Sequence, residues 1–371
     1  MPHAFTRTLV FMLALWTLMI GANAYAHSWP SIAFVPALLY ASAINRGRNG
    51  SRWIAIFAIS ILLMRAALPA DAADQRPYRI GVLNEAFAAN HPTVEGLRAG
   101  LRDLGFEEGR HVVFDIRFSK GDPKSLAPAA QALVKEGVDL LFTSNEVATH
   151  AAQAATRTIP IVFTLVGDPI ASGVVKQLAR PGGNLTGISS LTSDLMPKRL
   201  EILKTLYPGV RRVWFIHDAT DPTGAAALKK GMEAAQQLRI ELTPLGVADA
   251  PHVVAVLKTL QPGDALLAPD QDGFDIGASI LEKSLEARVP AMFPSSLWIE
   301  HGGLVSYGPD YYAQGLQAAQ LVAKILRGRR PADLPVESAD RVYFTLNVKT
   351  AVGFGLSVPS KVLFRADGIK Q

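Results

Sequence analysis

The feature that most constrains the fold of this chain is a regular alternation of short apolar runs with longer amphipathic stretches, which begins at Tyr78. Tyr78–Asn84 and Val138–Thr143 each predict a short buried strand, and apolar residues at helical spacing predict a helix over 93–104. A glycine-rich passage, Arg180–Gly187, interrupts the alternation, which then restarts. Strands separated by helices of about 10–15 residues indicate βαβ units and parallel sheets. The sequence therefore predicts an α/β protein with two similar lobes.

Polar side chains follow the predicted strands at the points where the strands end. In open α/β sheets, ligands bind at the carboxyl ends of the strands, so these residues are the first candidates for a binding site. They are Asn84-Glu85, Ser144-Asn145, Val166–Pro169, His217-Asp218, Asp270–Asp272 and Pro294-Ser295.

Motifs of nucleotide-binding and hydrolytic enzymes are absent from the sequence. No GxGxxG follows a strand, and there is no GxxxxGK[ST], HExxH or GxSxG. The eight histidines are scattered, without the spacing of metal ligands. Because the chain has no cysteine, it has no disulfide, thiolate metal site or thiol nucleophile. We therefore expect neither a cofactor nor a metal.

Asp270 and Asp272 are the strongest enzymatic candidates, since two carboxylates after a strand can act as acid and base. The same pair also suits an ammonium-binding site or the first turn of a helix, and ligand binding is the favoured interpretation. Asp168, which precedes Pro169, fits a turn or a ligand contact equally well. Ser144 either caps the next helix or, with that helix N-terminus, holds a carboxylate.

Residues 1–72 are expected to form a hydrophobic N-terminal export or membrane region, with apolar stretches at Leu9–Ile20, Ile32–Ile44 and Trp53–Leu68. The segment 46–72 resembles a secretory signal, with arginines, an apolar run and the small-x-small sequence Ala70-Asp71-Ala72. Alternatively, the first stretch is itself a signal, residues 8–44 form a membrane hairpin, or the natural chain starts nearer Arg46. Each alternative delivers residues 73–371 across a membrane.

The charge of the chain does not indicate a nucleic-acid partner. Lys and Arg number 37 against 32 Asp and Glu, but residues 1–72 contain five basic groups and one acid. The remainder holds 32 basic and 31 acidic groups, so it is nearly neutral, and it has no basic run.

Several segments together resemble a known family, the solute-binding proteins of ABC transporters in the group of tryptophan- and tyrosine-type binding proteins. The segments are Pro160–Asp168, Leu178–Gly187, Lys198–Leu206, Gly302–Pro309, Gln317–Pro335 and Leu346–Leu356. The resemblance implies the type I periplasmic binding fold, in which two Rossmann-like lobes with parallel sheets are joined by three hinge crossovers. It implies that lobe one takes 77–187 plus 306–338, and that lobe two takes 188–305 plus 339–371.

By the same resemblance, the ligand-facing residues are Asn84, Glu85, Ser144, Asn145, Thr164, Asp168, Asp218 and Asp270. The family often has Thr-Asp-Asn where this chain has Pro269-Asp270-Gln271, and often has Asn near His217-Asp218. Both departures bear on ligand identity.

The implied function is capture without chemistry. A monomeric protein in the periplasm would bind a small solute, such as an amino acid or a related carboxylate, and deliver it to an ABC permease and its ATPase in the inner membrane. The first alternative is an extracytoplasmic sensor anchored in the inner membrane through residues 8–68. The second is a hydrolase that uses Asp270 and Asp272.

Overall fold

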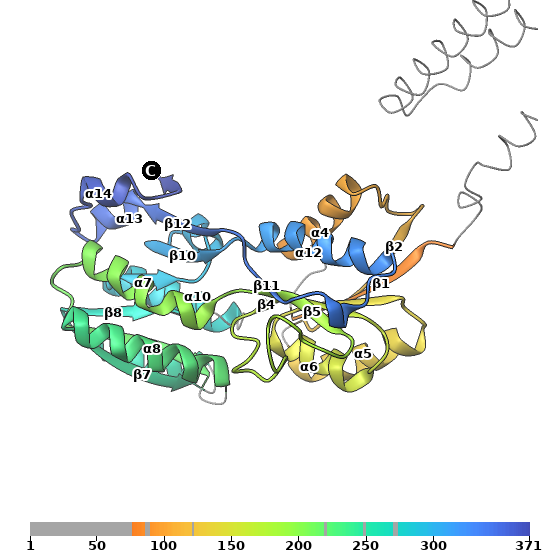
Figure 1. Ribbon diagram of the computed structural model, residues 1–371. Coiled ribbons are helices and arrows are strands. Elements are labelled where there is room, and N and C mark those ends of the chain that lie inside the picture. The colour runs from red at the N-terminus through yellow and green to blue at the C-terminus, as the bar shows by residue number, and fades with distance from the viewer. Residues whose placement is uncertain (1–75, 86–89, 121, 219–220, 248–249, 270–273) are drawn as a thin grey trace, which may run out of the picture. The chain divides into compact units, whose positions relative to one another are not determined.

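The alternating strands assemble into two sheets, each covered by helices on both faces (Figure 1). The computed structural model describes residues 76–371 except 86–89, 121, 219–220, 248–249 and 270–273. The expected export region and Asp270 therefore lie outside the described residues. Arg76–Gln371 forms one compact unit. Within the described ranges, no helix has both the length and the apolar character needed to span a bilayer.

The first sheet defines lobe one and has the strand order β11-β5-β4-β3-β1-β2, with every neighbouring pair parallel. Its strands are β1 (Tyr78–Asn84), β2 (Val112–Phe118), β3 (Leu140–Ser144), β4 (Ile161–Val166), β5 (Leu185–Ser189) and β11 (Glu337–Ser338). Helices α4 (Pro92–Asp103) and α12 (Tyr311–Leu326) cover one face. Helices α5 (Leu126–Lys135) and α6 (Glu146–Ala155) cover the other, and η2 (Pro123–Ser125) and η3 (Pro331–Asp333) are single turns.

The second sheet defines lobe two and has the order β13-β12-β10-β9-β8-β6-β7. Its strands are β6 (Arg212–Asp218), β7 (Glu241–Val247), β8 (Asp264–Leu267), β9 (Ala291–Phe293), β10 (Val305–Pro309), β12 (Val342–Asn347) and β13 (Gly368–Lys370). Helices α7 (Thr192–Leu206) and α8 (Pro222–Leu238) pack on one face, with α13 (Val348–Gly353) and α14 (Ser360–Leu363). Helices α9 (Ala250–Leu257), α10 (Phe274–Ala287) and α11 (Leu297–Glu300) complete the lobe.

The chain passes between the lobes three times: after β5, after β10 and after β11. Two of the expected boundaries differ from these positions. Residues 306–309 were expected in lobe one, but β10 continues to Pro309 because it pairs with β12 along its whole length. Residues 188–189 were expected in lobe two, but they pair with β4 and β11 in the first sheet.

The sequence predicted parallel sheets, but the second sheet is not purely parallel. Strand β12 runs antiparallel to β10. The connection from β10 to β12 leaves lobe two, forms α12 in lobe one and returns, so no helix crosses over within the sheet. The glycine-rich passage also leads into a strand that we did not predict, β5, whose residues are all buried.

Helices α4 and α12 lie in direct backbone contact. A side-chain carbon at Gly96 would overlap the Tyr312 carbonyl oxygen, and one at Gly315 would overlap the Thr93 carbonyl oxygen. The N-termini of both helices therefore meet at the carboxyl edge of the first sheet, beside the interlobe pocket.

Candidate functional site

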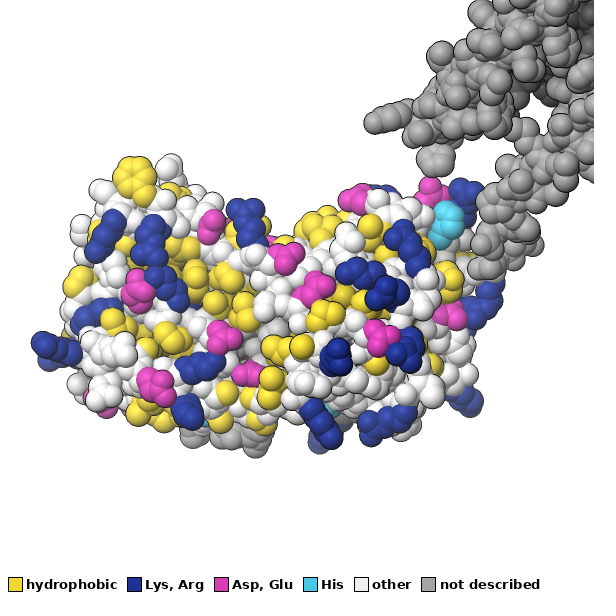
Figure 2. Space-filling model, in the orientation of Figure 1, with side chains coloured by type: hydrophobic (Ala, Val, Ile, Leu, Met, Phe, Trp, Pro, Cys, Tyr) yellow, Lys and Arg dark blue, Asp and Glu magenta, His cyan; other side chains and the backbone are white. Residues whose placement is uncertain are grey.

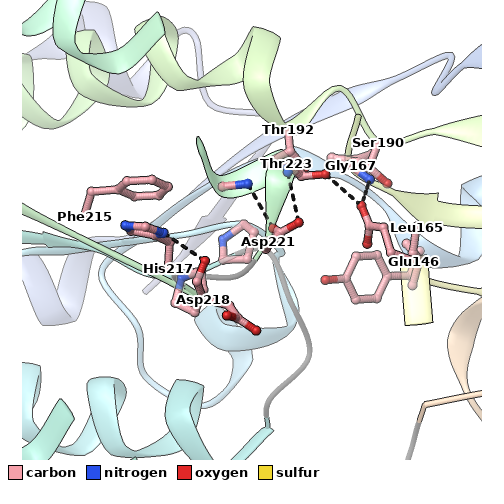
Figure 3. Close-up of a pocket in the computed structure, with 15 residues that line it drawn as sticks. Glu146, Leu165, Gly167, Ser190, Thr192, Phe215, His217, Asp218, Asp221 and Thr223 are labelled. Atoms are coloured by element: carbon pink, nitrogen blue, oxygen red, sulfur yellow. Dashed lines mark hydrogen bonds between the residues drawn. The ribbon is translucent and has the colours of Figure 1, made fainter. Parts of the chain in front are cut away.

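A pocket lies between the two lobes, at the carboxyl ends of β3, β4 and β6 (Figure 3). Lobe one contributes Glu146, Leu165 and Gly167, and lobe two contributes Phe215, His217 and several polar residues. The other described lining residues are Ser190, Thr192, Asp218, Asp221, Thr223, Gly224, Pro269, Pro294, Pro309 and Tyr311. The lining thus combines hydroxyl and carboxyl groups with apolar rings, as small-molecule sites usually do.

Glu146 joins the two lobes. It is the first residue of α6 and is only 8% exposed. Its Oε1 accepts a hydrogen bond from the Gly167 N–H at 2.8 Å and another from the Thr223 hydroxyl at 3.2 Å (Figure 3). Gly167 lies in lobe one, whereas Thr223 lies in the first turn of α8 in lobe two.

The surroundings of Glu146 disfavour its charged form. Burial, reinforced by the Asp221 carboxylate, raises the pKa of Glu146 to about 7, although the hydrogen bonds from Gly167 and Thr223 oppose the shift. At neutral pH this carboxyl group is therefore close to half-protonated.

Further contacts cross from lobe one to the start of α7. The Ser193 hydroxyl donates to Asp168 Oδ2 at 2.8 Å, and the Thr192 N–H donates to the Gly167 carbonyl at 3.0 Å. Gly167 is essential to this approach, because a Cβ there would lie 2.6 Å from Thr192 Oγ1 and 2.7 Å from Thr223 Cγ2.

The lobe-two wall is built by β6 and the helix that follows it. Asp221 caps α8, accepting hydrogen bonds from the N–H groups of Thr223 and Gly224. His217 stacks on Phe215, with ring centroids 5.1 Å apart, and its Nδ1 lies 3.0 Å from the Asp218 carbonyl oxygen. These contacts hold the side chains of Asp221 and His217 in place at the pocket wall.

Two aromatic rings meet at the N-termini of α4 and α12. His91 caps α4 and stacks on Tyr311, a pocket residue, with centroids 5.8 Å apart. Burial lowers the pKa of His91 to about 4, so the ring is neutral at physiological pH.

Several residues expected to face a ligand are engaged within the protein. Asn145 caps α6 through the Ala148 N–H and donates from Nδ2 to Glu85. Burial raises the pKa of Glu85, although the bond from Asn145 opposes the shift. The Ser144 hydroxyl lies 3.1 Å from that of Thr93, and both residues are buried.

Thr164 and Asp168 also make internal hydrogen bonds. Thr164 is fully buried and donates to the Thr143 carbonyl. Asp168 accepts from the N–H groups of Ile170 and Ala171 and so closes a turn, in addition to its bond from Ser193.

Asn84 and Asp218 are placed differently. Asn84 is 1% exposed, and its Nδ2 has no hydrogen-bond partner among the described residues. Asp218 lines the pocket. Asp270 lies outside the described residues, although its neighbour Pro269 is part of the pocket wall.

Sequence reasoning missed Glu146, Asp221 and Tyr311 as pocket residues. Glu146 directly follows Ser144-Asn145, so reading one residue further past the strand would have found it. Asp221 precedes Pro222 and has the pattern of a helix cap, which gave no indication of a pocket.

Comparison with known families gives one match that covers most of the chain. The family model described as ABC transporter substrate binding protein matches residues 86–370. A tyrosine-binding protein from Clostridioides difficile is 27% identical over 266 residues, which cover 70% of this chain and 76% of the relative.

Solved structures share the fold. A conserved domain protein from Vibrio cholerae O1 biovar El Tor is 28% identical, with a TM-score of 0.74, over 80% of this chain and 100% of that protein. A domain from Streptococcus pneumonia in complex with L-Trp is 24% identical, with a TM-score of 0.72, over 79% of this chain and 99% of that domain.

Proposed function

The chain belongs to the ABC transporter substrate-binding protein family, whose members bind small ligands and are not enzymes, and from this premise we propose that it captures a small amphipathic solute, such as an amino acid, and delivers it to a membrane permease. The observation that carries the proposal is the interlobe pocket, whose two walls are joined by hydrogen bonds that separation of the lobes would break. The family assignment therefore disfavours the hydrolase alternative.

Closure of the two lobes around the solute is the conformational change that couples solute binding to recognition by the permease. Contacts such as that from Thr223 to Glu146 form only when lobe two lies against lobe one. A solute that touches both walls adds to these contacts, and it shifts the balance between open and closed forms by its differential affinity for the closed form. The permease would then distinguish the loaded form by the relative position of the lobes.

Among the expected ligand-facing residues, Asp218 has the strongest support. Asn84 has a buried donor without a partner among the described residues, but it is not among the described residues that line the pocket. Asp218 offers a carboxylate at the pocket wall. Asp270 remains a proposed ligand contact by its place in the sequence, next to Pro269.

The proposed partners are an ABC permease and its ATPase, and the proposed location is the periplasm, with residues 46–72 as the export signal. On the face shown in Figure 2, basic and acidic side chains are interspersed over the described residues, which gives no support to a nucleic-acid partner. The alternative, an anchored sensor, predicts that residues 8–68 stay with the protein in the membrane fraction. N-terminal sequencing of the protein from cell fractions distinguishes the two.

A thermal-shift screen of the full chain tests solute capture. The panel contains the twenty amino acids, their decarboxylated amines, small carboxylates and polyols. A solute at 100 times its Kd should stabilise the protein by about 2.7 kcal/mol, which is readily measured. If no solute raises the unfolding temperature of a folded sample, the proposal is wrong.

A further inference from the structure

The charged side chains that line the described part of the interlobe pocket are acidic. They are Glu146, Asp218 and Asp221, and neither Lys nor Arg is among the described lining residues. His217 and Tyr311 are the other titratable groups there. Carboxyl groups gathered in a partly dehydrated cleft attract a cation and repel an anion.

The hydrogen bonds that other described residues donate to Glu146 reach only one of its carboxylate oxygens. Oε1 accepts from Gly167 and from Thr223 (Figure 3), and the backbone N–H of Glu146 itself also donates to the carboxyl group. None of the other described residues donates to Oε2. The residue is more than nine-tenths buried and lines the pocket. A carboxylate oxygen on the wall of a partly dehydrated pocket can accept further hydrogen bonds, and a charged N–H donor from a ligand makes a strong one.

We propose that Glu146 determines the class of ligand: the pocket binds a protonated amine with an apolar body, whose N–H donates to the second oxygen of Glu146, and binding requires no carboxylate on the ligand. The inference rests on the proposed function, because it assumes that the solute occupies the interlobe pocket. Phe215, Leu165 and Pro294 supply apolar wall for the body of the ligand.

The same carboxyl group then serves binding and closure. One oxygen accepts the lobe-two hydroxyl of Thr223, and the other accepts the amine. An amine that keeps Glu146 ionised strengthens the bond from Thr223, because hydrogen bonds to a charged acceptor are stronger than those to a neutral one. Ligand charge is thereby coupled to the position of lobe two.

Binding should also be linked to protonation. The titratable groups that line the pocket with Glu146 are Asp221, which caps α8, Asp218 and His217 from β6, and Tyr311 from α12. Because burial raises the pKa of Glu146 to about 7, an amine must displace a proton from it at lower pH. Amine affinity should therefore be about tenfold weaker at pH 6 than at pH 8.

Three probes that share a phenol ring and differ in charge test the inference: tyramine, L-tyrosine and 3-(4-hydroxyphenyl)propionate. Isothermal titration calorimetry on the full chain should show binding of tyramine and L-tyrosine and none of the propionate. Glu146→Gln should weaken tyramine binding at least tenfold and remove its pH dependence. Glu146→Asp, which keeps the charge, should retain part of the affinity, and the exposed Glu233→Gln should match the wild type.

The outcomes separate this inference from the proposed function. If L-tyrosine binds and tyramine does not, or if Glu146→Gln binds tyramine as tightly as the wild type does, the role of Glu146 is wrong and solute capture stands. The same holds if only a polyol such as allitol binds. If no probe and no member of the solute panel binds the folded protein, both proposals fall.

Discussion

Glu146 is a carboxyl group that the fold has largely removed from water without giving it a cationic partner among the described residues. Burial raises its pKa to about 7, against an ordinary value of 4.5. A carboxyl group with a raised pKa contributes most to stability below its unfolded pKa, and the contribution is lost as pH rises through the folded pKa. The loss from Glu146 between pH 4.5 and pH 8 should be about 3 kcal/mol.

Glu146→Gln should remove this pH dependence, because an amide does not titrate in this pH range. Its oxygen can still accept the hydrogen bonds from Gly167 and Thr223. The difference in unfolding free energy between variant and wild type should therefore move in favour of the variant by about 3 kcal/mol from pH 4.5 to pH 8. Urea unfolding at several pH values measures it, with Glu233→Gln as control. A constant difference across that range would show that Glu146 does not titrate with a raised pKa.

His91 should act in the opposite direction. Burial lowers its pKa to about 4, so its neutral form contributes stability above pH 6.5 that is lost as pH falls toward 4. His91→Asn keeps a side chain that can cap α4 and removes the titration. The variant should lose less stability than the wild type between pH 6.5 and pH 4, by on the order of 2 kcal/mol. Parallel acid-induced unfolding curves for the two proteins would contradict this.

The residues at the strand ends illustrate what sequence can predict about a site. Their location was predictable, because parallel strands place their carboxyl ends at one edge of a sheet. The sequence did not predict which of these residues make internal hydrogen bonds and which line the pocket. Asn145 has φ 76° and ψ 174°, and in this conformation its side chain faces Ala148 and Glu85, while Glu146 reaches the pocket. Periodicity carries no information about a single unusual backbone torsion.

At the scale of elements, the contact between α4 and α12 depends on glycine. Gly315→Ala would place a methyl group against the Thr93 carbonyl oxygen, and the helices would have to separate. Overpacking of this kind costs about 1–3 kcal/mol or more. Gly353, in the short helix α13, is the matched control, because a methyl group there meets nothing within 4 Å.

Thermal and urea unfolding of both variants give the comparison. Gly315→Ala should destabilise the protein by about 1–3 kcal/mol or more, whereas Gly353→Ala should be neutral or stabilising by up to about 1 kcal/mol. Equal stability of the two variants would mean that α4 and α12 can move apart at no cost.

The elements themselves were largely predictable, and the exceptions have physical causes. Buried strands such as β1 and β3 contain short apolar runs, and helices such as α4 show apolar residues at helical spacing. Strand β5 was missed because its sequence, LTGIS, follows two glycines and contains a third. Gly187 is required there, since a Cβ would overlap Phe163. The antiparallel direction of β12 depends on how the chain returns from lobe one, which no local pattern encodes.

At the scale of the whole compact unit, the two lobes meet through polar contacts rather than a shared apolar core. The apolar clusters lie within one lobe or the other, whereas Glu146–Thr223 and Asp168–Ser193 are hydrogen bonds that cross between the lobes. Such an interface exchanges its hydrogen bonds for water at modest cost, which permits hinge motion. The resemblance predicted three crossovers, but their positions depend on where β5 and β10 stop pairing, and they differ from expectation by a few residues.

Gly167 sets how closely the lobes can approach. Gly167→Ala would bring a methyl group to 2.6 Å from Thr192 Oγ1 and 2.7 Å from Thr223 Cγ2, so the closed arrangement would be destabilised by about 1–3 kcal/mol while each lobe keeps its core. Because solute binding requires closure of the lobes, affinity should fall by roughly 5- to 150-fold. Small-angle scattering at saturating solute should give a larger radius of gyration than for the wild type. Unfolding midpoints without solute, and Gly353→Ala as a second control, separate loss of closure from loss of folding. If Gly167→Ala binds solute and compacts as the wild type does, the lobes do not close by bringing Thr192 and Thr223 against this glycine. The proposal that the Thr223–Glu146 hydrogen bond couples closure to ligand capture would then also be wrong.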